Sequence, residues 1–200
     1  MMATKYRCSA LGLLLLLLLM SASNAAAESA KEQLQGTIDS IIAVLKTIHG
    51  PEDIEKNRSS VRQILLPRFD FAAMAQSSLG SRWKDLNGKE EQFVSVFADY
   101  AENSYMSTLG SYRGEKVVYD RDWADGKSAE VDTRVVGGHG EPIKIGYKLH
   151  LEEDGQWKVY DAVIDDISVI GNYRSQFARI LRTASLDELM QTLRAKATSR

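Results

Sequence analysis

The stretch Trp157–Phe177, WKVYDAVIDDISVIGNYRSQF, changes from a strand pattern to a helix pattern and decides the fold class. Its first half, Trp157–Ile164, follows the hairpin signal Asp154-Gly155 and is typical of a returning strand. Its second half passes through Asp165-Asp166 into a helix that we expect over Asn172–Arg182. A strand that leads directly into a helix places a sheet next to a helical layer.

Upstream of this stretch, apolar and polar residues alternate with the period of two that is typical of strands. Lys127–Val136 and Ile143–Leu151 alternate cleanly, and Glu115–Arg121 is predicted to be a further strand. The turn Gly137-Gly138-His139-Gly140 joins the first two. Because short turns connect neighbouring strands, we predict a four-stranded antiparallel meander.

Helical patterns lie on both sides of the predicted sheet. Four helices are expected before it, at Lys31–Ile48, Pro51–Leu66, Phe71–Leu79 with Asp70 as N-cap, and Lys89–Leu109. The capping box Ser185–Glu188 opens a last helix that runs to about Ala195. The predicted fold is α+β: N-terminal helices, a four-stranded antiparallel meander, and C-terminal helices packed on one sheet face around an apolar cavity.

The N-terminus has the three parts of a secretory signal peptide. Lys5 and Arg7 precede a leucine-rich run, and Ala25-Ala26-Ala27 offers a small-residue cleavage site. We therefore predict a cleaved signal peptide at residues 1–27 and a single exported domain at residues 28–200, soluble after cleavage. Cleavage would remove the only cysteine, Cys8, and change the formal charge from −2 to −4, which disfavours nucleic acid as a partner.

A catalytic site has little support in the sequence. The three histidines lack metal-ligand spacing, and there is neither an H-E-x-x-H nor a G-x-S-x-G motif. We expect no cofactor and no metal site. The alternative to a binding protein is an enzyme with Asp161 or Asp165 as acid/base in an apolar pocket. A turn is the more common setting for Asp165 and Asp166, since aspartates there accept bonds from neighbouring N–H groups.

Several segments together resemble one family. They are, in chain order, Phe69–Ala75, Leu79–Trp83, the predicted helix with Phe93, Phe97 and Tyr105, Ile143–Leu149, and most specifically Trp157–Phe177. The chain resembles the MlaC-type periplasmic phospholipid-binding family, also called the toluene-tolerance auxiliary family. It departs from that pattern at Asp165-Asp166, where the family often has Glu-Gly.

The resemblance implies a carrier of phospholipid between the outer and inner membranes, within a system that maintains lipid asymmetry. Its implied partners are an inner-membrane ABC transporter with an MCE-domain subunit and an outer-membrane lipoprotein/porin complex. A hopanoid or another apolar cargo would fit the same architecture, and an adaptor without cargo is a further reading. The expected lipid-binding wall consists of Phe97, Tyr105, Val131, Tyr147, Val163, Ile167, Val169, Tyr173 and Phe177.

Overall fold

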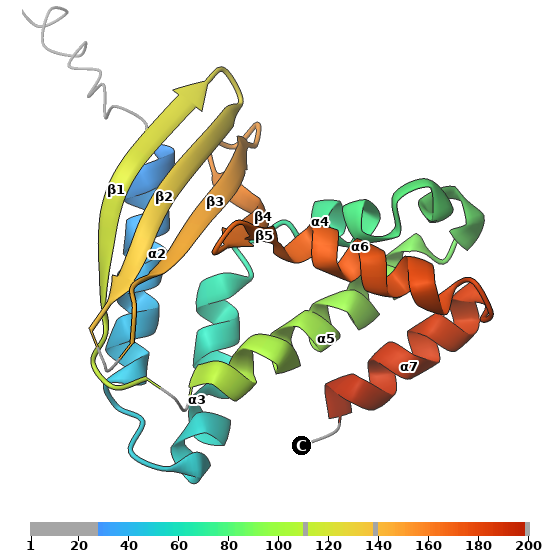
Figure 1. The fold of residues 1–200 in the computed structure, drawn as a ribbon, viewed down its shortest axis with the longest axis horizontal. Helices are drawn as coiled ribbons and strands as arrows, with labels where there is room; N and C mark the ends of the chain where they lie inside the picture. Colours follow the sequence, from blue (N-terminus) through green and yellow to red (C-terminus); the bar gives the residue numbers. More distant parts are fainter. Residues whose placement is uncertain (1–27, 110–111, 138–139, 199–200) are drawn as a thin grey trace, which may run out of the picture.

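A twisted sheet stands on one side of the molecule and a group of helices on the other (Figure 1). The computed structural model describes residues 28–109, 112–137 and 140–198. The predicted signal peptide, residues 1–27, lies outside the described residues, as does His139.

The predicted α+β class is confirmed. The elements are α2 (Ala30–Leu45), α3 (Pro51–Leu65), α4 (Phe71–Leu79), the 3₁₀ helix η1 (Gly80–Leu86), α5 (Glu90–Leu109), β1 (Lys116–Asp125), β2 (Ser128–Val136), β3 (Ile143–Leu151), β4 (Trp157–Ile164), β5 (Ile167–Ser168), α6 (Val169–Ile180) and α7 (Leu186–Thr198).

The sheet is an antiparallel meander in the order β1-β2-β3-β4-β5. The predicted meander is confirmed, with one strand more than expected. The fifth strand, β5, has two residues, which is too short to show any alternation. Asp165 and Asp166 form the turn before it with φ values of 46° and 67°, as two-residue hairpin turns require. The structure thus confirms the turn and adds the strand that follows it.

Helix α6 begins at Val169, three residues before the predicted start at Asn172. Ser168 is its N-cap, and its hydroxyl accepts a hydrogen bond from the Gly171 N–H at 2.8 Å. The early start has a physical reason: the Ser168 cap allows the helix to begin directly after β5. The other predicted helices are confirmed to within a few residues at their ends.

The buried apolar residues form three clusters. The helical cluster joins α4, α5, α6 and α7 around Phe93, Phe97 and Phe177. The sheet cluster packs α2 against the sheet, and a small cluster around Val61 joins α3 to α2. Phe69, which lies just before α4, contacts all three clusters. It is therefore the apolar junction between the helical layer and the sheet.

A buried polar network lies beside Phe69. The Arg68 guanidinium, 8% exposed, donates to Gln33 Oε1 at 2.6 Å, to Thr37 Oγ1 at 3.1 Å and to the Trp157 carbonyl oxygen. Gln33 Oε1 also accepts the Trp157 N–H at 2.9 Å. The backbone of Arg68 continues the connection, since its carbonyl oxygen accepts the Val159 N–H at 2.8 Å. These bonds tie α2, the start of α4 and β4 together.

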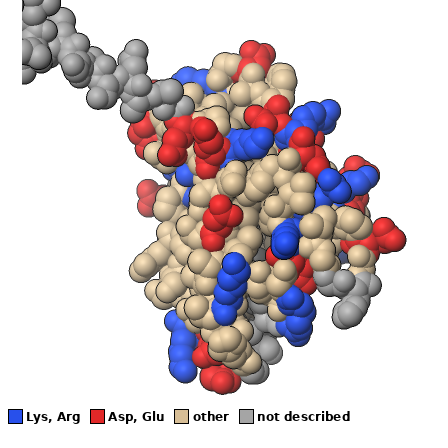
Figure 2. Space-filling view, turned by 90° about the vertical axis from the view of Figure 1, so that its left-hand side faces the viewer, with Lys and Arg blue, Asp and Glu red and all other residues tan. Residues whose placement is uncertain are grey.

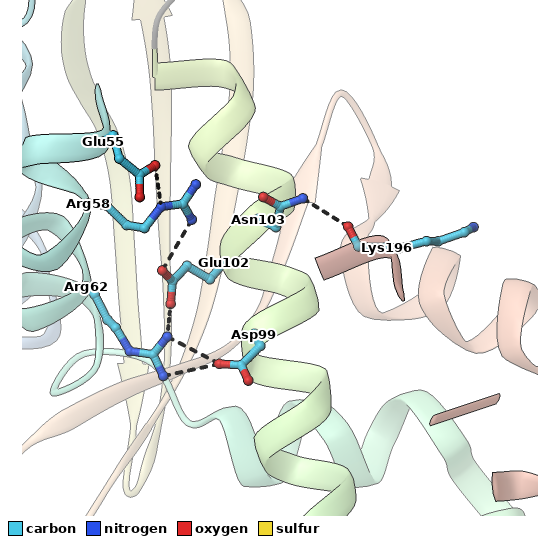
Figure 3. A network of polar contacts seen from close by, with 7 residues as sticks. All are labelled: Glu55, Arg58, Arg62, Asp99, Glu102, Asn103 and Lys196. Atoms are coloured by element: carbon cyan, nitrogen blue, oxygen red, sulfur yellow. Dashed lines mark hydrogen bonds and ion pairs between the residues drawn. The ribbon is translucent and has the colours of Figure 1, made fainter. Parts of the chain in front are cut away.

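A charged network holds α3 against α5 (Figure 3). The Glu102 carboxylate is buried between two guanidiniums, with Arg58 Nη1 at 3.5 Å and Arg62 on its other oxygen. Arg62 also bonds Asp99 at 3.3 Å. Because an unpaired buried carboxylate is costly, both arginines on α3 are needed to keep Glu102 in place. The network positions α3 as a brace between α2 and the middle of α5.

Replacing Arg68 with lysine tests the buried network. Lysine keeps the charge and loses the planar fork that reaches three acceptors, so we expect Arg68→Lys to lower the free energy of unfolding by about 2–3 kcal/mol. The matched control is Arg121→Lys, which alters an exposed pair with Asp132 and should change stability by less than about 0.5 kcal/mol. Urea unfolding followed by circular dichroism measures both. Equal effects would contradict the assigned role of Arg68.

The Asp165-Asp166 turn generates a second stability prediction. Asp166 has a left-handed φ that glycine adopts without strain. Glycine also increases the conformational entropy of the unfolded chain, which offsets part of this gain. We therefore expect Asp166→Gly to raise the free energy of unfolding by about 0.5 kcal/mol. Asp165→Gly should instead be destabilising, because the Asp165 carboxylate accepts the Lys144 N–H at 3.1 Å. Chemical denaturation of the two variants measures both changes in the free energy of unfolding. A destabilising Asp166→Gly would show that the Asp166 side chain itself holds the turn.

Candidate ligand surface on the sheet

The sheet face that α2 covers has one buried end and one open end. At the buried end, Ala129, Leu149 and Trp157 are 4%, 0% and 7% exposed against Ala30 and Leu34 of α2. At the open end, Ile143, Ile164 and Ile167 are 44%, 40% and 65% exposed. A large apolar side chain left open on the same face as the core is the kind of surface that a ligand covers.

The strand register shows that the exposed isoleucines belong to continuous rows. Residues directly opposite on paired strands share a face. One row crosses all five strands as Tyr119, Thr133, Ile145, Ile164 and Ile167, and the next runs through Val117, Val135 and Ile143. We call the apolar members of these two rows the open apolar face: Val117, Val135, Ile143, Ile145, Ile164 and Ile167.

Three polar side chains lie where the open apolar face meets the sheet cluster. Thr133, 2% exposed, donates its hydroxyl to the Ile145 carbonyl oxygen at 3.0 Å. Burial raises the pKa of Tyr147 to about 12, partly offset by a hydrogen bond with Thr133. Burial also raises the pKa of Tyr119, whose buried hydroxyl has no hydrogen-bond partner within the described part of the chain. Such an orphaned hydroxyl on an apolar face can bond to a polar group of a ligand.

The structure divides the nine residues that were predicted to form one wall. Val131 and Tyr147 belong to the sheet cluster, and Ile167 lies on the open apolar face. Phe97, Tyr173 and Phe177 lie in the helical cluster, where Phe97 meets Tyr173 at 5.5 Å and Phe177 at 6.3 Å between ring centroids. Val169 packs against the same cluster, and the side chain of Tyr105 is outside the described residues.

Val163 lies on the opposite side of the sheet from Val131 and Tyr147, which corrects the expected wall. It borders a hollow lined by charged side chains, among them Arg134, Asp132 and Lys144. The cause is a bulge: Leu149 pairs with Val159, but Lys148 pairs with Asp161, so β4 contains one extra residue. One extra residue reverses the side of every residue after it, which moves Ile164 to the apolar face in place of Val163.

The aspartates considered as catalytic candidates have structural partners. Asp161, 8% exposed, accepts hydrogen bonds from the Ser168 hydroxyl at 2.7 Å and from the Ile170 N–H at 3.1 Å. Its carboxylate therefore holds the first turn of α6 against β4. Asp165 bonds the Lys144 N–H across the hairpin. Both carboxylates serve the strand-to-helix connection, where polar side chains replace missing backbone partners.

The fold and this surface define a class: an α+β binding protein whose sheet presents an apolar face with a few polar groups at its edge. Comparison with known proteins agrees with that class. The family model for "MlaC protein" matches residues 35–195, so the chain belongs to the MlaC protein family. This membership confirms the resemblance seen in the sequence.

The relatives are named for phospholipid transport and toluene tolerance. The chain is 25% identical over 146 residues to the intermembrane phospholipid transport system binding protein MlaC of Haemophilus influenzae, covering 70% of this chain and 68% of that protein. It is 26% identical over 174 residues to the toluene tolerance protein ttg2D of Pseudomonas putida, covering 84% and 80%. A phospholipid-binding protein from Ralstonia solanacearum, solved with a phospholipid, matches with a TM-score of 0.73 and 25% identity over 85% of this chain and 97% of that one.

Two tyrosine variants test whether the Tyr119 hydroxyl is unpaired in the lipid-free protein. Tyr119→Phe removes a buried hydroxyl that has no hydrogen-bond partner among the described residues, so the free energy of unfolding should rise by about 1 kcal/mol. Tyr147→Phe removes a hydroxyl that is hydrogen-bonded to Thr133 and should lower the free energy of unfolding by about 1 kcal/mol. Denaturation of delipidated protein measures both. A drop in stability for Tyr119→Phe would show that this hydroxyl is already bonded.

Proposed function

We propose that the protein is a periplasmic phospholipid carrier whose open apolar face takes up the acyl tails. The observation that supports this most directly is the row Ile145, Ile164 and Ile167, which continues the buried core outward to open surface. Membership of the MlaC family supports the same conclusion. The Tyr119 hydroxyl at the inner limit of the face would bond to a lipid ester or phosphate oxygen.

The energetics of lipid transfer explain why such a protein needs an apolar surface and no reactive group. Exposing acyl tails to water costs about 0.8 kcal/mol per methylene, so two tails with ~30 methylenes cost about 24 kcal/mol. A carrier lowers that cost by covering the tails. The carboxylates of Asp161 and Asp165 are engaged in the fold, which leaves the enzymatic alternative without support from these residues.

The remaining predicted wall residues form a second, helical side of the proposed site. Phe97, Tyr173 and Phe177 pack on one another and on Phe93, and Phe69 connects their cluster to the sheet. We propose that the tails enter between the sheet and this aromatic cluster. Val131, Tyr147, Ile167, Val169 and Tyr105 remain proposed contacts on the same path, and Ile164 replaces Val163.

The proposed partners follow from the family and from the predicted export signal. A carrier between two membranes must dock on a complex in each, and we propose an inner-membrane ABC transporter with an MCE-domain subunit and an outer-membrane lipoprotein/porin complex. Within the described residues, no helix is both long enough and apolar enough to cross a bilayer. On the face shown in Figure 2, acidic and basic side chains are intermixed, which does not suit nucleic acid.

Adjacent residues on opposite sheet faces test the proposed site. Ile164→Asp places a carboxylate on the open apolar face, where contact with acyl tails would leave the charge without water, so bound phospholipid should be lost. Val163→Asp makes the same change one residue earlier, among the charged side chains of the opposite face, and should retain lipid. Organic extraction of each purified protein followed by mass spectrometry measures lipid per chain.

Both variants must first show the circular dichroism spectrum of the wild-type protein. Loss of lipid in Ile164→Asp with retention in Val163→Asp supports the proposal. Retained lipid in a folded Ile164→Asp would contradict the placement of the tails. A wild-type protein that neither contains nor takes up phospholipid would contradict the function itself.

A further inference from the structure

Three side chains meet on the sheet face opposite the open apolar face. Nε2 of His150 lies 3.1 Å from Oδ2 of Asp70 and 2.9 Å from Oε1 of Glu152. The three ligand-type atoms all lie within 4.8 Å of one another. They come from the start of α4, from β3 and from the turn after β3. None of these residues belongs to the proposed lipid site.

Local structure positions the side chains of Asp70 and His150 and the backbone of Glu152. The Asp70 carboxylate uses Oδ1 to accept the Ala73 N–H at 2.8 Å, which caps α4 and leaves Oδ2 facing His150. The His150 ring stacks on Tyr160 with 5.6 Å between centroids and 13° between planes. The backbone N–H of Glu152 closes the β3–β4 turn by bonding to the Gln156 carbonyl oxygen at 2.9 Å. The Asp70 carboxylate and the His150 ring are thus positioned before any ion arrives, and Oε1 of Glu152 lies 2.9 Å from Nε2.

We propose that Asp70, His150 and Glu152 bind a divalent transition-metal ion of the zinc type, with water completing its coordination. Metal–ligand bonds of about 2.0–2.1 Å place neighbouring ligand atoms about 2.9–3.4 Å apart. The two measured separations from Nε2, 2.9 and 3.1 Å, match such neighbouring positions. One imidazole nitrogen with carboxylate oxygens suits zinc, cobalt or nickel better than magnesium.

Hydrogen bonds alone explain this arrangement of the three side chains less well than a bound metal ion does. A neutral imidazole has one N–H and can direct a single proton from Nε2, yet two carboxylates converge on that nitrogen. A metal ion interacts with all three atoms at once and offsets the charge of both carboxylates. Since Asp70 begins α4 and the other two lie on the β3–β4 hairpin, the ion would join the helical layer to the sheet.

No metal site was expected from the sequence, because the three side chains are brought together only by the fold. Asp70 is far from His150 and Glu152 along the chain, so no spacing motif connects them. The parallel bridge between Phe69 and Val159 is what brings the start of α4 to the sheet edge beside His150.

Metal titration of the full mature protein tests the site. The protein, prepared without a histidine tag and freed of metal by chelation, is titrated with Zn²⁺ by calorimetry and with Co²⁺ by visible absorption, with Mg²⁺ for comparison. We expect one equivalent of Zn²⁺ and of Co²⁺ to bind, a higher melting temperature with Zn²⁺, and no response to Mg²⁺. Lipid content, measured in parallel, should not change.

The variants compare ligands with matched neighbours. His150→Ala and Glu152→Gln should each weaken Zn²⁺ binding by at least about tenfold. The controls are Glu153→Gln, the same change at the next residue, which is exposed, and His49→Ala, an exposed histidine in the loop between α2 and α3. Both controls should bind as the wild type does. If His150→Ala does not fold, Glu152→Gln is compared with Glu153→Gln instead. Glu152 lies at a surface turn, so its substitution should not prevent folding.

Two results would overturn the proposal. One is the absence of saturable Zn²⁺ binding at one equivalent in the wild type, which would leave the cluster as ion pairs only. The other is undiminished binding in folded Glu152→Gln compared with Glu153→Gln. Loss of lipid with intact metal binding would instead bear on the proposed carrier function, so the two proposals fail separately.

Discussion

The hydrogen bonds of the buried Arg68 guanidinium are the interaction on which the rest of the structure depends. It lies where α2, the start of α4 and β4 meet, and it is satisfied by Gln33, Thr37 and the Trp157 carbonyl oxygen. A buried charge is tolerated only where acceptors surround it, so the network favours this relative placement of the three elements. Phe69 follows directly in the chain, and its contacts with all three apolar clusters become possible only in that placement.

With the sheet and the helical layer joined at this point, the apolar face of the sheet is not buried over its whole extent. The result is a face that is core at one end and open at the other, with Ile164 and Ile167 at the open end. Ordinary cores close such a face, because exposed apolar rows lose the stabilisation that burial gives. The open end therefore makes sense as a surface completed by a ligand, and the family to which the chain belongs agrees with an acyl chain in that role.

Local structure could be predicted because its causes are local. The Asp70 cap, the Ser185 capping box and the alternation of β2 and β3 depend on residues a few positions apart, and the structure confirms each of them. The site was less predictable. The prediction for Val163 was wrong in its sheet face because the extra residue between Val159 and Asp161 reverses the parity of β4. The sequence signal was a break in alternation: Asp161 has the parity of Trp157 and Val159, while Ala162 and Ile164 are apolar at the other parity. Phe97, Tyr173 and Phe177 have the residue types of both a core and a cavity wall, so pattern alone could not separate the two.

The sequence by itself determined the longer helices and strands, the α+β class, the meander and the family resemblance, because these follow from periodicity, caps and turns within short windows. Only the tertiary structure decided which apolar residues share a face and which charged residues meet. The bulge in β4 selects Ile164 over Val163, and the bridge between Phe69 and Val159 carries Asp70 to His150 and Glu152. The first depends on how β3 pairs with β4, and the second joins backbone segments that are far apart in the chain, so neither follows from the local preference of one segment.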